Sequence, residues 1–393
     1  MKNFKIYLSG LVGIFMLFSL ACANELFIIK SGVYTISGNE YSNLVVNVDS
    51  SKDMGEVVIK LNNATLSSNT LTPLNIINAS SITIELEKDT KNVIHQGELL
   101  KNTKDFPNAA LYSNVDLKIV GEGSLLVNSA YKDGIYSEKN IEINGGNIIV
   151  EAEEEGITSK NSINVSNSSI NITANKDALK TNSKKDEENG NIILEQSTLY
   201  LQSKSDAISA DRELIVNGGD YTISQSKKGI KASTFVVENG NITISSSKNG
   251  IDVKNSFVMQ AGELTLTSGE KALFAKNNVI LNGGSLQIIN AFEGIESANI
   301  TINNGILNLT TIEDGININD EKGAITIVNG EIFMVAGGDG IDSNGNFVMS
   351  GGKLAINQLG LLKKSDKPVD ITGKITITGG EITNEKGTPL IIR

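Results

Sequence analysis

The sequence has little of several residue types, and each shortage excludes a class of protein. Its 393 residues include one cysteine and one histidine, so neither a disulfide framework nor a Cys/His zinc site can form. The single histidine, His95, also leaves no convincing Ser/His/Asp constellation, and we assign it no role. Tryptophan is absent and proline occurs only four times. Scarce proline suits parallel strands, because their ladders use every backbone N–H.

Basic residues are also in the minority. The chain has 34 Lys and Arg against 45 Asp and Glu, which gives a formal net charge of −11. No basic stripe would neutralise bound phosphates, so the composition argues against a nucleic-acid partner. The same charge balance permits cation binding.

Glycine is abundant, with 38 residues, and it marks a repeat. The repeating unit is clearest at residues 141–163, where apolar and polar residues alternate on both sides of Asn144-Gly145-Gly146. This pattern reads as strand, tight turn and strand, followed by a corner at Glu155-Gly156-Ile157. The corner recurs about every 22 residues. Its small residues are Gly134, Gly156, Ala178, Ala207, Gly229, Gly250, Ala272, Gly294, Gly315 and Gly340.

One such unit cannot bury its own row of isoleucines, whereas stacked copies can. The sequence therefore predicts an all-β fold, a right-handed single-stranded parallel β-helix with about 22 residues per coil. We expect a single domain over residues 24–393. Residues 24–53 are expected to cap it, because the end of a solenoid exposes an apolar cross-section and unpaired strand edges. The polar stretch 181–191 should be a loop inserted at one corner.

Residues 1–23 are expected to be an export signal, with Lys2 and Lys5 before an apolar run that is too short for a spanning helix. The only cysteine lies at its end, in Ser19-Leu20-Ala21-Cys22, which resembles a lipobox. We therefore expect lipidation of Cys22 and a membrane-anchored lipoprotein on the cell envelope. Ordinary cleavage before Asn24, giving a secreted protein, is the alternative.

Equivalent residues of successive coils in a parallel β-helix stack about 4.8 Å apart, so the repeat defines columns of side chains. The residue after each small corner residue should point inward, and its neighbours outward. Stacked carboxylates repel one another, so lysines or a bound cation must compensate. One such acidic ladder has lysines beside it. A solvated ladder of mixed charge is therefore the alternative to a bound cation there. The acidic ladder comprises Asp133, Glu155, Asp177 and Asp206.

A second group of acids lies on three consecutive coils near the C-terminus, with no lysine among them. Carboxylate oxygens in this number suit Ca²⁺, which takes six to eight oxygen ligands. An acidic surface face is the alternative. The candidate calcium ligands are Glu293, Glu296, Glu313, Asp314, Asp339 and Asp342.

Two tyrosines, Tyr112 and Tyr136, occupy equivalent positions on adjacent coils and should face outward. Exposed rings at these positions could stack on the C–H faces of sugars. Alternatively, they cover a neighbouring strand.

The recurring Asn-Gly-Gly-x-Ile-x-Ile turns and Asp-Gly-Ile corners resemble a family of bacterial exported carbohydrate-binding domains. The resemblance covers nearly the whole mature chain and includes residues 32–38, 108–112, 186–188 and 339–342. It implies a parallel β-helix similar to that of pectate lyases, with binding of Ca²⁺ and of plant polysaccharides such as polygalacturonate and cellulose. Lys228 and Lys271 depart from the family pattern, which usually has acids there.

These observations predict a monomeric, noncatalytic carbohydrate-binding protein of the bacterial cell surface that binds acidic or plant-type polysaccharide with the help of calcium. Membrane contact is expected only through the lipid anchor. A calcium-dependent uronate lyase of the pectate type is the first alternative, and an adhesin with a protein partner is the second. A lyase needs a base of lowered pKa close to its cation. The nearest lysine, Lys271, lies one coil before Glu293 and beside Glu270, which should keep it protonated.

Overall fold

A computed structural model describes residues 5–8, 24–98, 107, 109–183, 189–359, 366–384 and 386–390 of the chain. Cys22 and residues 186–188 lie outside this part. The chain divides into two units. The first comprises Met1–Lys204 and Ser209–Asp211, and the second comprises Ser205–Ile208 and Arg212–Arg393. The single domain with an N-terminal cap stays a prediction.

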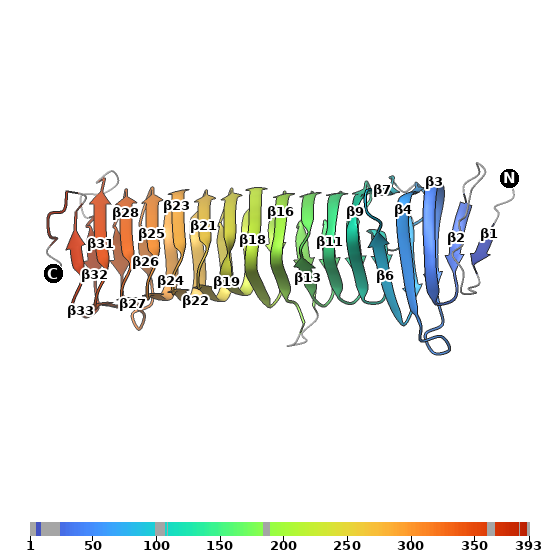
Figure 1. The fold of residues 1–393 in the computed structure, drawn as a ribbon. Coiled ribbons are helices and arrows are strands. Elements are labelled where there is room, and N and C mark those ends of the chain that lie inside the picture. The colour runs from blue at the N-terminus through green and yellow to red at the C-terminus, as the bar shows by residue number, and fades with distance from the viewer. Residues whose placement is uncertain are drawn as a thin grey trace. The chain divides into compact units, whose positions relative to one another are not determined.

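The first unit is built from strands alone in its described residues (Figure 1). Its strands are β1 (Lys5–Leu8), β2 (Asn24–Ile28), β3 (Gly32–Asn47), β4 (Glu56–Ser68), β5 (Leu74–Asn78), β6 (Ser81–Leu86), β7 (Lys91–Gln96), β8 (Ala109–Ser113), β9 (Leu117–Ser129), β10 (Asp133–Ser137), β11 (Ile141–Ala152), β12 (Ile157–Ser159), β13 (Ile163–Ser166), β14 (Ser169–Ala174), β15 (Leu179–Thr181) and β16 (Ile192–Ser203).

The second unit likewise contains only strands in its described residues, and β17 (Asp206–Ser209) holds residues of both units. The remaining strands are β18 (Glu213–Gln225), β19 (Lys228–Ser246), β20 (Ile251–Met259), β21 (Glu263–Ser268), β22 (Lys271–Leu281), β23 (Ser285–Ala291), β24 (Glu293–Ile302), β25 (Ile306–Thr311), β26 (Ile316–Ile318), β27 (Ala324–Ile327), β28 (Glu331–Ala336), β29 (Ile341–Ser343), β30 (Asn346–Met349), β31 (Lys353–Gln358), β32 (Val369–Ile371), β33 (Ile375–Ile377) and β34 (Glu381–Thr383).

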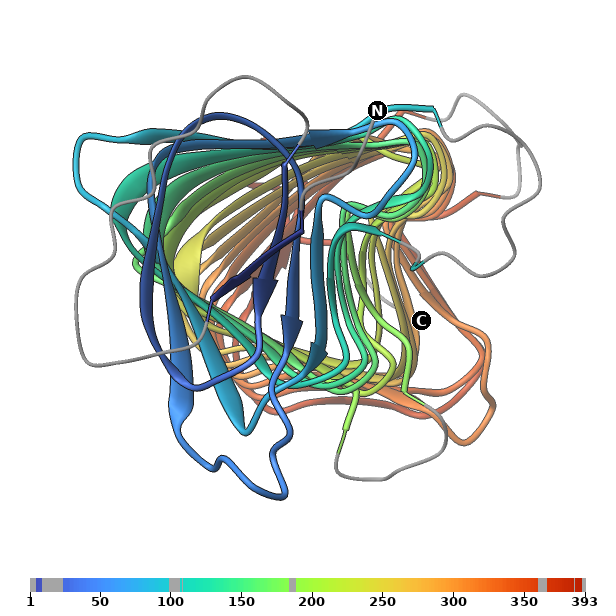
Figure 2. The same ribbon diagram turned by 90° about the vertical axis from the view of Figure 1, so that its right-hand side faces the viewer.

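Each unit is a parallel β-solenoid in which strands pair with their equivalents on neighbouring coils. In the first unit, Ile135 is in register with Ile157, and Ile157 with Leu179, in steps of 22 residues. In the second unit, Ile251 is in register with Leu273, and the ladder continues coil by coil to β29. Figure 2 shows successive coils of each unit lying behind one another. The predicted fold class and its period of about 22 residues are therefore confirmed.

The core of each coil is formed by the inward half of the alternating pattern. Strand β14, for example, alternates exposed Ser, Asn and Thr with buried Ile170, Ile172 and Ala174. The residue after each corner glycine also points inward, as predicted, and Ile135, Ile157 and Leu179 are all fully buried. Stacking such rows removes apolar surface from water along the length of the unit.

In β11 the Asn-Gly-Gly segment is a bend within one long strand, whereas Asn282-Gly283-Gly284 and Ser350-Gly351-Gly352 lie between two strands, as predicted. Strand β11 runs from Ile141 to Ala152 and passes through Gly145 and Gly146, whose φ angles are +89° and +79°. Only glycine adopts such angles without strain. Strand β11 stays paired with β9 through the bend, because β9 bends at the same place. The pairing has one register shift, between Gly145 and Asn147.

The corner glycine is required by the close approach of the next coil. A Cβ atom on Gly156 would lie 2.4 Å from Cγ2 of Ile172 and 2.5 Å from the carbonyl oxygen of Ala178. This corner therefore accepts only a residue without a side chain unless the backbone moves. The predicted insertion also lies at a corner, since β15 ends at Thr181 and β16 begins at Ile192. Within the described residues, no helix is present that could span a membrane.

Candidate functional site

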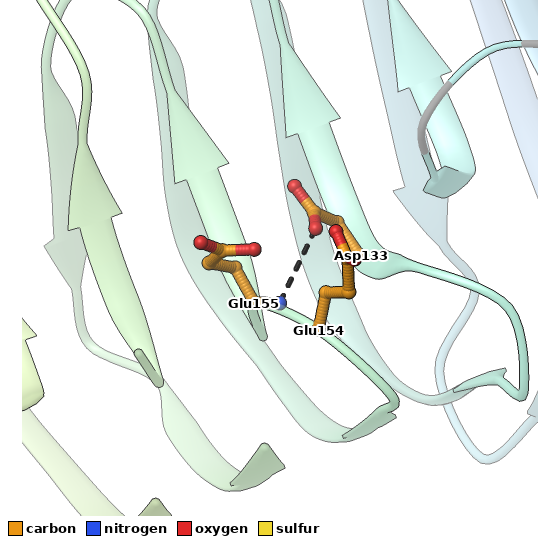
Figure 3. Close-up of side chains that lie close together, drawn as sticks. All are labelled: Asp133, Glu154 and Glu155. Atoms are coloured by element: carbon orange, nitrogen blue, oxygen red, sulfur yellow. Dashed lines mark hydrogen bonds between the residues drawn. The ribbon is translucent and has the colours of Figure 1, made fainter. Parts of the chain in front are cut away.

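Three carboxylates from two adjacent coils meet at the corner between β10 and β12. Asp133 is the first residue of β10, and Glu154 and Glu155 precede the corner Gly156 on the next coil. Figure 3 shows the three side chains close together, and one ligand oxygen from each lies within 4.8 Å of the others. The backbone N–H of Glu155 donates to Oδ1 of Asp133 at 3.2 Å. We call Asp133, Glu154 and Glu155 the corner cluster.

Burial and mutual repulsion perturb the ionisation of the corner cluster. Asp133 is 5% exposed and Glu155 is 9% exposed. Burial first, and then the negative charge of Glu155, raise the pKa of Asp133 far above its ordinary value. Burial also opposes ionisation of Glu155, but the hydrogen bond and charge of Lys180 outweigh it and lower the pKa of Glu155. At neutral pH Asp133 is therefore largely protonated, whereas Glu155 is ionised.

Two lysines compensate part of this charge. Nζ of Lys180 lies 2.8 Å from Oε1 of Glu155 and 3.4 Å from Oδ2 of Asp177. Nζ of Lys176 lies 3.1 Å from Glu154. Burial alone would lower the pKa of both lysines, but hydrogen bonds and charges of the carboxylates raise it. Both lysines therefore remain ammonium ions at neutral pH.

The predicted ladder that contains two members of this cluster is buried rather than solvated. Asp177 is 7% exposed and Asp206 is 9% exposed, like the other two members. Asp206 belongs to the second unit, where its Oδ2 lies 3.7 Å from Nζ of Lys231. The lysines expected beside the ladder are present, but its interpretation as a solvated face is wrong.

A buried hydroxyl lies on the same coil as the corner cluster. Thr158 follows Glu155 by three residues and is in register with Tyr136 and Lys180 on the coils before and after. It is 3% exposed, and its Oγ1 atom has no hydrogen-bond partner in the part of the chain that the structure describes. A buried hydroxyl without a hydrogen-bond partner is costly, so Thr158 is an unusual residue for this position.

The predicted calcium ligands near the C-terminus do not form a comparable cluster. A lysine does intervene, contrary to the expectation, because Nζ of Lys271 lies 3.2 Å from Oε2 of Glu293 and also contacts Glu296 closely. Among the described residues, which include all six candidates, no three of the six bring ligand oxygens within 4.8 Å of one another. Their role in binding metal stays a prediction.

The aspartates of that group repel one another across coils. Asp314 accepts a hydrogen bond from the backbone N–H of Asp339 at 2.8 Å, and Asp342 is in register with Asp370. Burial, followed by the charges of Asp314, Asp342 and Asp370, raises the pKa of Asp339 to about 6, although the backbone N–H of Lys367 opposes this shift. Burial and the same kind of repulsion raise the pKa of Asp342.

Tyr112 and Tyr136 do occupy equivalent positions on adjacent coils. Their rings stack on each other, with centroids 5.6 Å apart and planes 6° from parallel. The Oη atom of Tyr112 donates to Oδ1 of Asn114 at 2.9 Å and contacts Oε1 of Glu138 at 3.2 Å. Tyr136 is only 7% exposed, so the expectation that both rings face solvent is wrong. Stacking on sugar stays a prediction for this pair.

Sequence reasoning missed Glu154 and the pairing of Lys271. Glu154 stands immediately before the corner column, as Glu313 does in the C-terminal group. A rule that includes the residue before each corner acid, as for Glu313, therefore also selects Glu154. Lys271 is in register with Glu293 on the next coil, so the 22-residue column could also have revealed their contact.

The protein is thus a parallel β-solenoid whose candidate site is a group of carboxylates at one corner. The family model described as "Carbohydrate-binding domain-containing protein" matches residues 23–294 and 270–388. The chain belongs to this family.

A curated relative carries the same description. It is a carbohydrate-binding domain-containing protein of Acetivibrio thermocellus, 34% identical over 130 residues, which make up 32% of this chain and 45% of the relative. The match thus spans less than half of the relative's length. A solved structure, a gadolinium derivative of a polysaccharide lyase-like protein from C. thermocellum, is 24% identical with a TM-score of 0.49. That comparison covers 64% of this chain and 96% of the other.

Proposed function

We propose that this protein is a noncatalytic carbohydrate-binding protein of the bacterial cell surface, which binds acidic or plant-type polysaccharide with the help of calcium. Membership of the carbohydrate-binding family supports the sugar ligand. The single observation that supports binding with the help of calcium is the corner cluster, Asp133, Glu154 and Glu155.

The donor set of the corner cluster fits Ca²⁺. Three carboxylates are hard oxygen donors. Ca²⁺ accepts six to eight oxygens in irregular geometry, so these groups leave positions for water or for a carboxylate of the ligand. Burial, and then the charge of Glu155, raise the pKa of Asp133, and a cation would relieve the second of these effects. Calcium would here hold an acidic sugar against the protein.

The lysines beside the corner cluster favour binding over cleavage. A uronate lyase abstracts a ring proton, and its base must be unprotonated at the working pH. The carboxylates around Lys176 and Lys180 raise the pKa of both ammonium groups, as Glu296 and Glu293 do for Lys271 against the opposing effect of burial. These lysines are therefore suited to attract an acidic polysaccharide, not to deprotonate it.

The test is binding of polygalacturonate to the purified protein, with calcium and with a chelator. We expect retention with calcium, weaker retention with chelator, and at least tenfold weaker binding by Asp133→Asn and Glu154→Gln, a loss of about 1.4 kcal/mol. Glu263→Gln, which replaces an exposed acid of β21 outside both acidic groups, is the control and should bind normally. Ultraviolet absorbance of unsaturated product should stay flat.

Three results would argue against the proposal. Steady product formation would identify a lyase. Equal binding by Asp133→Asn and the native protein would remove the corner cluster from the mechanism. Failure to retain either acidic or neutral plant polysaccharides would favour an adhesin with a protein partner.

A further inference from the structure

One outward face of the first unit has a column of apolar side chains that Asn171 interrupts, with polar columns on both sides. It is formed by β7, β9, β11, β14 and β16, which are paired in register. The central column of outward side chains consists of Val93, Leu126, Ile149, Asn171 and Tyr200. We call this column the Tyr200 stripe.

The Tyr200 stripe is accessible, unlike the paired tyrosines of β8 and β10. Tyr200 is 40% exposed and Ile149 is 38% exposed. Nε2 of Gln202 donates to Oη of Tyr200 at 3.2 Å, which restrains the ring on the strand that carries it. Tyr112 and Tyr136, by contrast, cover each other's faces. Among these three tyrosines, Tyr200 is the one that presents an uncommitted ring to solvent.

The two columns beside the stripe supply hydrogen-bonding groups. On β14 and β16 they consist of Ser169, Thr173, Thr198 and Gln202, none of which is charged. On the preceding coils the flanking columns also contain Lys91 and His95 of β7, and Nδ2 of Asn128 donates to Oε2 of Glu151 at 2.7 Å. An apolar centre flanked by amides and hydroxyls matches a sugar ring, whose C–H face is apolar and whose rim carries hydroxyls.

We propose that the Tyr200 stripe is a binding face for a neutral polysaccharide, which lies across the strands with its ring faces on Tyr200 and Ile149. The inference rests on the proposed sugar-binding function and adds a second site, distinct in charge from the corner cluster. The lack of charge on β14 and β16 selects a neutral chain, because a uronate carboxylate would find no cation there.

The second unit offers an internal control. Its strands β18, β19 and β21 carry Thr222, Thr243 and Thr265 at the same outward position, in register. In the column that contains these threonines, an exposed aromatic is found at Phe333 of β28, which is 44% exposed and lies between Asn308 and Ala355. Phe333 lacks the apolar column that precedes Tyr200. Phe333→Ala therefore removes a comparably exposed ring at a position without that apolar column.

The test is calorimetric titration of the full chain with a soluble β-1,4-linked glucose oligosaccharide, with polygalacturonate and calcium as a parallel probe. Tyr200→Ala should weaken binding of the glucose oligosaccharide about tenfold, and Ile149→Ser should weaken it severalfold. Tyr200→Phe and Phe333→Ala should bind it normally. Binding of polygalacturonate should be unchanged in all four variants, and matching melting curves will establish that each variant folds.

Two results would overturn this inference alone. The first is that the native protein binds polygalacturonate but not the neutral oligosaccharide. The second is that Tyr200→Ala and Phe333→Ala lose equal affinity for the neutral oligosaccharide. Failure of the native protein to bind either probe would overturn both this inference and the proposed function.

Discussion

At the scale of single residues, Asp339 has the clearest link between position and stability. Burial and three neighbouring aspartates raise its pKa to about 6, against an ordinary value of 3.8. Between these two values the folded chain holds a proton that the unfolded chain has released. The contribution of Asp339 to stability is therefore complete below pH 4 and declines as the pH rises through 6.

We predict that Asp339→Asn stabilises the protein at pH 7 and not at pH 4. The amide keeps an oxygen that can accept from the backbone N–H of Lys367 but removes the repelling charge. After allowance for partial exposure, the gain in the free energy of unfolding at pH 7 should be about 1 kcal/mol. Urea denaturation at both pH values measures it.

The exposed acid Glu331, replaced by Gln, serves as the control for a general loss of negative charge. An equal gain at both pH values, or the same gain from Glu331→Gln, would show that repulsion at Asp339 is not the cause.

The sequence predicts which residues stack at this scale, but not how deeply they are buried. Tyr112 and Tyr136 were placed on adjacent coils because a fixed period is enough to align them. The burial of Tyr136 and Asp133 depends on how neighbouring side chains fill the surface around them. A column position carries no information about that packing, so it predicts that a side chain points outward but not that it is exposed.

At the scale of elements, the corner between β11 and β12 shows how strongly the next coil constrains each unit. The amide of Gly156 donates to the carbonyl of Asp177 at 2.9 Å, which holds the two coils together at their closest approach. The bend in β11 shows the same constraint. Alternation and glycine predicted a turn there, but pairing with both neighbouring coils keeps the strand continuous.

We predict that Gly156→Ala destabilises the protein by about 2 kcal/mol, because its Cβ would collide with a backbone carbonyl that cannot rotate away. Denaturation of the native and variant proteins in urea tests this. Ala178→Gly, at the next corner, should cost about 0.5–1 kcal/mol, the entropic penalty of glycine alone. Similar losses at the two corners would mean that close approach does not decide the identity of residue 156.

At the scale of the whole molecule, the remaining question is where the protein resides. Cys22 lies outside the described residues, so lipidation stays a prediction that depends on the lipobox-like stretch before it. An acyl anchor would place the polysaccharide sites at the cell envelope, whereas cleavage before Asn24 would release them.

We predict that Cys22→Ser shifts the protein from the membrane fraction to the soluble fraction, because it removes the only thiol to which lipid could be attached. Fractionation of expressing bacteria, followed by mass measurement of the mature N-terminus, detects both the shift and the acyl group. Equal soluble secretion of both proteins, with Asn24 as the first residue, would refute lipidation.

The 22-residue register has a consequence for how such a chain can change its length. Residues 135–156 and 157–178 form successive coils whose strands align residue for residue. Duplicating or deleting one complete coil would leave each remaining strand with an equivalent neighbour, whereas losing a single residue within a strand would turn its inward side chains outward. Genes for such proteins should therefore lengthen and shorten in whole coils, and smaller insertions should survive at corners, as between β15 and β16.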